Sequence, residues 1–380
     1  MQANKDLPTK RLTSLDALRG FDMFWIVSGE GIAFGLSKAT HLPFFDAMSR
    51  QLHHTVWNGF TLYDLIFPLF IFIAGVSMPF SFGKKLDHLT GPEKTAAKKR
   101  LYRPLIIRCV ALILLGMVVN GALALPGYQQ TRFASVLGRI ALSTFFAAII
   151  YLNTSFKKQV IWLLALLFGY WALMAWVPVP GFGAGVITPE GSLSSYLDRQ
   201  FLPGKVLRGD YDPEGILSTI PAIGSALLGV FTGRFLRQGE EKYSPKGKAA
   251  VMLAAGILLL LIGILWNLGF PINKNIWSSS FVVFCAGCSL LLLGVFYLVI
   301  DVWHFKKWCR PFVWLGMNSI LIYMASHGLV NFTYSSDAIF GGLIHLAPER
   351  YYEALLWVGV ALIQFGLLYF LYKKRIFLKL

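Results

Sequence analysis

Long apolar runs separated by short polar segments dominate this chain. A helix needs about 20 apolar residues to cross the hydrocarbon core of a bilayer, and ten runs reach about that length. The pattern predicts an all-α polytopic membrane protein, a bundle of about ten transmembrane helices forming a single domain over residues 1–380. The runs cover residues 15–36, 60–82, 104–124, 135–152, 159–178, 214–235, 249–268, 278–301, 311–332 and 353–372.

Basic residues alternate between successive loops. Of the 35 Lys and Arg residues, 26 lie at the N-terminal end, in or beside every second loop, and after the last run, over residues 1–19, 83–108, 153–159, 234–248, 303–310 and 373–380. Cytoplasmic loops carry such an excess, so we expect both termini in the cytoplasm. Taking the source as bacterial, we expect the inner membrane. The loops at 37–59, 179–213, 269–277 and 333–352 would then face the periplasm.

Composition narrows the class of protein further. The chain is 56% hydrophobic with a mean hydropathy of +0.60, which exceeds the usual range of soluble domains. The net charge of +16 lies in short loops between apolar runs, so it indicates membrane topology and not a nucleic-acid-binding face. Cys285 and Cys288 form a CxxC with no second pair and no nearby histidine. We interpret them as packing residues and expect no metal.

The stretch before and into the second run carries the strongest candidate chemistry. His53 and His54 precede Trp57 and Asn58, and Asp64 lies one turn inside the apolar helix. An imidazole can accept a proton near pH 7, an amide can hold a polarised carbonyl, and a carboxylate can fix a histidine tautomer. The alternative is a pair of interfacial histidines and a helix-capping carboxylate. We favour it for His53, and the residues alone leave the choice open for His54.

The first run has a polar face. Asp16, Arg19, Asp22 and Glu30 recur at helical spacing. Asp16 and Arg19 fit an ion pair at the cytoplasmic interface as well as they fit a functional site. Asp22 lies deeper and Glu30 lies near the outer end, and a bundle interior or an aqueous cavity explains both better than lipid does.

The basic segment 83–108 lies on the expected cytoplasmic side. Its Lys and Arg residues are explained most simply by positive-inside topology. A more specific explanation is a binding site for the phosphates of a nucleotide-containing co-substrate. Arg103 and Arg108 adjoin the third run and are the best candidates for such a site. In the ninth run, Asn318 and Ser319 lie near the cytoplasmic end, where they either tie helices together or face the same co-substrate.

Two outer loops carry residues that suit a sugar. Residues 210–214 hold three carboxylates, including Asp212. They fit a Ca²⁺ site, a sugar-binding rim or helix N-terminal charges. Asn273, Asn275 and Trp277 place amides beside an aromatic ring, which suits sugar hydroxyls, although the asparagines could equally cap the eighth run.

Several motifs together resemble a family, the transmembrane acetyltransferases typified by lysosomal heparan-α-glucosaminide N-acetyltransferase, which has many bacterial relatives. That family transfers acetyl from cytoplasmic acetyl-CoA to a glucosamine amine across the membrane. Its active histidine precedes the WNG motif, which matches His54 here. Ser28 or Glu30 takes the place of an asparagine in the family's VNYGGG-like stretch, and we expect no large lumenal domain before the first run. The matching segments are RLTSLDALRG (11–20), WNGFTLYDLIFPLFIFIAGVSM (57–78), YDPEG (211–215), PINKNIWSSSFV (271–282), GMNSILIY (316–323) and KKRIF (373–377).

The resemblance implies an acetyl-CoA-dependent acyltransferase that acts on an amino sugar or glycan end at the outer face. The alternative is an inner-membrane transporter of amino sugars or cell-wall sugars, an uptake role with which bacterial relatives have been linked. We expect the lipid bilayer and no nucleic acid among its partners, and the sequence is compatible with a homodimer. The expected catalytic residues are His54, Asn58 and Asp64, the co-substrate residues Arg19, Arg103, Arg108, Asn318 and Ser319, and the sugar contacts Glu30, Trp57, Asp212, Asn273, Asn275 and Trp277.

Overall fold

The computed structural model describes residues 12–378. This part of the chain is helical, with two isolated β-bridges and no strand, which confirms the predicted all-α class. The α-helices are α1 (Thr13–Phe24), α2 (Glu30–Thr40), α3 (Pro43–Gln51), α4 (Leu62–Leu86), α5 (Gly91–Val119), α6 (Val136–Asn153), α7 (Phe156–Trp176), α8 (Leu193–Phe201), α9 (Thr219–Leu236), α10 (Pro245–Trp266), α11 (Ser279–Phe296), α12 (Arg310–Met317), α13 (Ser319–Met324), α14 (Phe332–Ile344) and α15 (Tyr352–Lys373). π-Helical turns at Trp25–Gly29, Tyr297–Val302 and Ala325–Leu329 follow α1, α11 and α13.

Each of the ten predicted runs lies on helical segments. Among the described helices, eight are long and apolar enough to cross a membrane, and α12 with α13, bent by 77°, make a ninth if counted as one broken span. The first predicted run is helical over residues 13–40 but is not among them, because its charged residues lower its hydropathy. The protein is therefore a multi-pass membrane protein. Ten crossings and cytoplasmic termini stay predictions.

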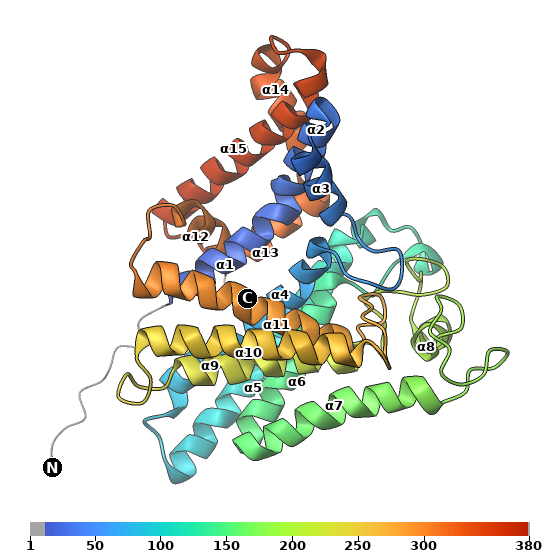
Figure 1. Ribbon diagram of the computed structural model, residues 1–380, viewed down its shortest axis with the longest axis vertical. Coiled ribbons are helices and arrows are strands. Elements are labelled where there is room, and N and C mark those ends of the chain that lie inside the picture. Colours follow the sequence, from blue (N-terminus) through green and yellow to red (C-terminus); the bar gives the residue numbers. More distant parts are fainter. Residues whose placement is uncertain (1–11, 379–380) are drawn as a thin grey trace.

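The loops gather at two ends of the bundle (Figure 1). The connections after α4, α6, α9 and α11 lie on the left of the view, and those after α3, α5, α7 and α10 lie on the right. The left-hand connections are the basic segments that the sequence assigns to the cytoplasm. The chain thus runs back and forth between two ends, and the loop that carries His54 lies at the right-hand end.

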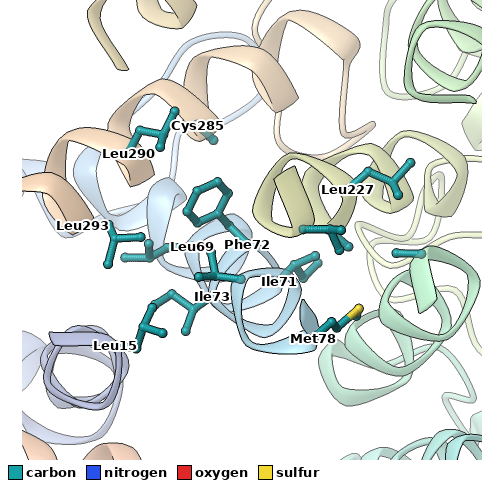
Figure 2. Packing of buried hydrophobic residues seen from close by; sticks show 14 of the residues in the cluster. Leu15, Leu69, Ile71, Phe72, Ile73, Met78, Leu227, Cys285, Leu290 and Leu293 are labelled. Carbon is teal, nitrogen blue, oxygen red and sulfur yellow. The ribbon is translucent and has the colours of Figure 1, made fainter. Parts of the chain in front are cut away.

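Helix α4 forms the centre of the largest buried cluster. Its side chains Ile71, Phe72 and Ile73 are at most 1% exposed. Figure 2 shows them in one cluster with Cys285 and Leu293 of α11. Cys285 is itself 1% exposed and has no disulfide partner, which agrees with the packing role expected for it.

Small residues bring α4 and α9 into backbone contact. A Cβ atom on Gly75 of α4 would overlap the carbonyl oxygen of Ala226 on α9, and one on Gly229 of α9 would overlap that of Phe72. Glycine at such positions allows membrane helices to approach closely and gain van der Waals contact. This packing fixes the axis of α4, and the start of the same helix carries Asp64.

Polar residues of the first helix lie inside the bundle. Arg19 Nη1 is 3.7 Å from Asp16 Oδ1, so the expected interface ion pair is present. Asp22 is 3% exposed, and Glu30 accepts a hydrogen bond from Tyr63. Neither of these two carboxylates faces lipid, as the sequence predicts.

The segment 333–352 differs from the predicted outer loop. Most of it forms α14, which packs beside α15. Asn331 caps this helix, because its side-chain oxygen accepts a hydrogen bond from the backbone N–H of Tyr334. A helix of 13 residues is too short to register as a span, which explains why the apolar pattern did not predict it.

Candidate active site

The start of α4 fixes the position of Asp64. Thr61 and Asp64 form a capping box, in which the backbone N–H of Thr61 donates to Asp64 Oδ2 at 3.2 Å. The hydroxyl of Thr55 donates to the same oxygen at 3.1 Å, whereas the hydroxyl of Thr61 donates to the carbonyl oxygen of His53 at 2.7 Å. The carboxylate is fully buried, and these donors leave Oδ1 for another partner.

That partner is His54. Its Nδ1 lies 2.8 Å from Asp64 Oδ1. An ionised carboxylate only accepts hydrogen bonds, so Nδ1 carries the proton and Nε2 keeps a free lone pair. The His54 side chain is 46% exposed and lines a cavity, whereas His53 stacks on Phe34 with ring centroids 4.5 Å apart. The pair can support proton abstraction or nucleophilic attack at Nε2.

The loop between α10 and α11 docks onto the histidine loop. Gly59 N donates to Ile272 O at 2.8 Å, and Asn273 Nδ2 donates to Asn58 Oδ1 at 3.0 Å. Asn58 is exposed and does not line the cavity. Asn58 and Asn273 therefore join the two loops, and the expected action of Asn58 on a carbonyl stays a prediction.

Lys274 lies on this docked loop and brings an ammonium group to His54. Its Nζ is 2.9 Å from His54 Nδ1, 3.0 Å from Nε2 and 3.6 Å from Asp64 Oδ1. The Lys274 side chain is 13% exposed and lines the same cavity. Burial lowers the pKa of Lys274, although the carboxylate of Asp64 acts in the opposite direction. The site therefore combines a carboxylate, an imidazole and a lysine.

Tyr63 links His54 to the first helical segment. Its ring centroid lies 4.7 Å from that of His54, and its hydroxyl donates to Glu30. Tyr63 lines the cavity and Glu30 does not. Glu30 is thus placed to orient Tyr63, and the direct sugar contact expected for it has no geometric support.

A cavity of about 980 Å³ extends from His54 towards the opposite end of the bundle. Lys274 and Asn275 lie with His54 at one end of the cavity, and Arg19 and Arg108 line the other end. We call these the outer and the inner end after the topology that the sequence predicts. Apolar side chains dominate the wall between them. The volume falls in the range of sites that bind small ligands and cofactors. Those apolar lining residues are Met23, Ile26, Ile66, Phe67, Phe70, Ala74, Leu112, Val136, Leu137 and Ile140.

The inner end is basic. Arg19 Nη2 donates to Ser77 Oγ at 3.2 Å, and Nε of Arg108 is buried without a hydrogen-bond partner among the described residues. A second cavity of about 500 Å³ adjoins the first, shares Ser77, Ser81 and Arg108 with it, and adds Lys85 and Thr144 to the polar lining. Arginine and lysine side chains in such a setting can bind phosphate.

Arg103 does not join this basic end. It is exposed and lines neither cavity. Arg103 and Arg108 are five residues apart on α5, and at 3.6 residues per turn they project about 140° apart. The sequence predicted that both arginines lie near the co-substrate, but only Arg108 faces the cavities.

Asn318 and Ser319 lie at the break between α12 and α13. Asn318 Nδ2 donates to Ile376 O, and Asn318 Oδ1 accepts from Leu378 N, both at 3.0 Å. This amide therefore holds the C-terminal segment, and its expected contact with the co-substrate stays a prediction. Ser319 lines the main cavity and remains a candidate for that contact.

Asp212, expected to hold the sugar, is instead 1% exposed in an ion-pair network. Arg132 donates from Nε to Oδ2 at 2.9 Å and from Nη2 to Oδ1 at 2.6 Å. Burial alone would raise the pKa of Asp212, but the hydrogen bonds and charge of Arg132 outweigh burial and lower it. Arg132 and its second partner Glu214 line the cavity, so they replace Asp212 as candidate substrate contacts.

The two predicted sugar-binding tryptophans do not line the main cavity. Trp57 Nε1 donates to Ile187 O at 3.1 Å, and its ring packs 4.8 Å from that of Tyr211. Trp277 is 1% exposed, with the guanidinium of Arg139 5.0 Å from its ring centroid. Both rings therefore support the outer loops, and of the outer residues predicted for the sugar only Asn275 lines the cavity.

The sequence did not predict Lys274, Tyr63 or Arg132 as site residues. A signal for two of them existed: Lys274 stands between two candidate asparagines, and Tyr63 directly precedes Asp64. Arg132 gave a weaker signal, because a single cation in an outer loop is common and its position beside Glu214 depends on the fold.

Comparison with known proteins identifies the family. The family described as "Heparan-alpha-glucosaminide N-acetyltransferase, catalytic" matches residues 11–264. The heparan-alpha-glucosaminide N-acetyltransferases of Mus musculus and Homo sapiens are each 29% identical to the chain, over 98% and 97% of its length. The chain spans 62% and 60% of these relatives. The matched region contains the His54–Asp64 pair and both inner arginines, and the chain belongs to the heparan-alpha-glucosaminide N-acetyltransferase catalytic family.

Proposed function

We propose that this protein is a transmembrane N-acetyltransferase that transfers the acetyl group of cytoplasmic acetyl-CoA to the amine of an amino sugar at the periplasmic face of the inner membrane. The observation that carries the proposal is the cavity that joins Arg19 and Arg108 at one end to His54 at the other. Family membership supports the reaction class.

The inner end suits the charged part of acetyl-CoA. Arg19 and Arg108 bind its phosphates, and Ser77 and Ser319 offer hydroxyls beside them. Moving several phosphate charges through hydrocarbon would cost far more than binding them at the mouth. The narrow pantetheine arm then follows the apolar wall, and the thioester reaches His54.

The outer end suits acyl transfer. Asp64 holds the Nδ1 proton of His54, so Nε2 can take a proton from the acceptor amine as it attacks. The same lone pair could instead receive the acetyl group before the amine does. Arg132 and Glu214 line the wall nearby and are placed to bind polar groups of the acceptor.

Adjacent histidines give a matched test. The protein is purified into nanodiscs, and transfer of labelled acetyl from acetyl-CoA to glucosamine is measured. His54→Ala should abolish transfer, while His53→Ala, which changes a ring stacked on Phe34, should keep it. Transfer by His54→Ala at the wild-type rate, in a variant that elutes and melts like wild type, would refute the mechanism.

A transporter of amino sugars would use the same outer residues without acetyl chemistry. Proteoliposomes separate the two functions. A transferase requires acetyl-CoA and produces acetylated sugar, whereas a transporter accumulates labelled amino sugar without acetyl-CoA. Accumulation without product would replace the proposed function.

A further inference from the structure

We propose that Lys274 is a catalytic residue whose ammonium group binds the carbonyl oxygen of the acetyl group as negative charge develops on that oxygen. The inference rests on the proposed acetyl transfer. It assigns an electrostatic role to a side chain that neither the motifs of the sequence nor the comparisons single out.

The position of the Lys274 ammonium relative to His54 is the first argument. Nζ is almost equidistant from the two ring nitrogens, at 2.9 Å and 3.0 Å. A hydrogen bond directed along the lone pair of one nitrogen would place the other nitrogen much further away. The ammonium therefore lies over the imidazole ring, and the in-plane lone pair of Nε2 remains available to the acceptor.

Charge at the site is the second argument. Asp64 is fully buried, and its nearest described cation is Lys274, 3.6 Å away. Burial lowers the pKa of Lys274, and the charge of the nearby Asp64 carboxylate opposes that effect. A charged donor held in a cavity with a largely apolar wall stabilises developing charge more strongly than one in water.

The chemical step explains where that charge appears. The acceptor nitrogen forms a bond to the acetyl carbon while Nε2 of His54 takes the amine proton, and the carbonyl electron pair moves onto oxygen. Lys274 Nζ lies 3.0 Å from Nε2, so an acceptor amine that donates its proton to Nε2 would bring the acetyl oxygen close to the ammonium group. When the carbonyl re-forms, the carbon–sulfur bond breaks and the thiolate takes the proton from His54. Amide and free thiol result, and Lys274 ends as it began.

A purely structural role for Lys274 is the competing explanation. In that view the ammonium only neutralises Asp64, and removing it would lower the rate only because the buried carboxylate would then lack a counterion. The two views differ in a double mutant. If Lys274 binds the oxyanion, Lys274→Met added to Asp64→Asn should lower the rate further, by at least about tenfold, whereas a counterion of Asp64 would add nothing once the charge is gone.

Kinetics in nanodiscs test the proposal directly. Lys274→Met should lower kcat about 100–1000-fold, the usual effect of removing one oxyanion donor, with the KM for acetyl-CoA changed less than about threefold. Lys274→Arg retains the positive charge, so its kcat should be at least about tenfold higher than that of Lys274→Met. Lys205→Met is the matched control, because Lys205 is an exposed lysine of another outer loop outside the cavity lining. It should behave as wild type.

The outcomes separate this inference from the proposed function. If wild-type protein transfers no acetyl group, the proposed function fails. If wild type is active, His54→Ala is inactive and Lys274→Met keeps kcat within about threefold of wild type, only the role of Lys274 fails. Equal kcat losses in Lys274→Met and Lys274→Arg, with elution and melting temperature unchanged, would also overturn it, because the charge would then not matter.

Discussion

Replacing Asp64 by asparagine should lower kcat by about 10⁴-fold while preserving the fold. Oδ2 of Asp64 receives hydrogen bonds from the backbone N–H of Thr61 and from the hydroxyl of Thr55. In Asp64→Asn these donors select the amide oxygen for that position. The amide nitrogen then occupies the position of Oδ1, where it faces Nδ1 of His54.

An amide nitrogen only donates, so His54 must present an unprotonated Nδ1 and move its proton to Nε2. The lone pair that faces the acceptor is then lost. Imposing the wrong tautomer on a catalytic histidine costs about 10⁴-fold in kcat, or about 5 kcal/mol of transition-state stabilisation. Because Asn is also a good residue near a helix start, we expect the capping interactions of α4 to survive in large part.

Comparing two substitutions sharpens the assay. Asp64→Ala removes the acceptor but imposes neither tautomer, so it should be at least as active as Asp64→Asn. Asp210→Asn, at an exposed outer carboxylate, is the control and should match wild type. The kcat of each variant and its melting temperature in nanodiscs are measured together. The reasoning is wrong if Asp64→Asn keeps kcat within about threefold of wild type, or if Asp64→Ala is far less active than Asp64→Asn at equal stability.

Three further variants test the cavity, the packing and a buried carboxyl group. Arg108→Gln should raise the KM for acetyl-CoA about 10–100-fold, because it removes a charged contact with phosphate. Arg103→Gln, at an exposed site outside both cavities, should leave this KM unchanged. Equal effects of the two substitutions would contradict phosphate binding by Arg108. Gly75→Leu should reduce folded yield and melting temperature, costing about 3 kcal/mol or more because its side chain meets backbone of α9, whereas Gly169→Leu, with open space around it, should not. Burial raises the pKa of Asp198 to about 7, so the folded state binds a proton more tightly than the unfolded chain does. The free energy of unfolding therefore falls as the pH rises from about 4 to about 7, by at most about 4 kcal/mol. Asp198→Asn should flatten that part of a melting-temperature profile against pH, and an unchanged slope would show that another group is responsible.

The hydrophobic pattern predicted the helices well because a bilayer imposes a minimum length of apolar helix on each crossing. It did not predict α14, which is too short for the pattern to find. It did predict a helix over the first run, although the buried carboxylates there keep this segment out of the helices that are apolar enough to cross a membrane. Both are stabilised by packing within the bundle, which hydropathy does not measure.

Local chemistry was readable where the partners lie close in sequence. His54 and Asp64 are ten residues apart, and Thr61 with Asp64 is a short-range capping box, so the pairing follows from one loop and one helix start. The partner of Asp212 is 80 residues away, and the sequence did not show that Arg132 occupies its carboxylate.

The sequence by itself determined the class of protein, the helical segments and the stretch that carries the histidine, because these depend on composition and on neighbours along the chain. Only the tertiary structure decided which side chains face the cavity. Helix rotation turns Arg108 inwards and Arg103 outwards, and loop docking brings Lys274 to His54 across 220 residues of sequence. Such placements depend on how helices pack against one another, and no local pattern of residues encodes them.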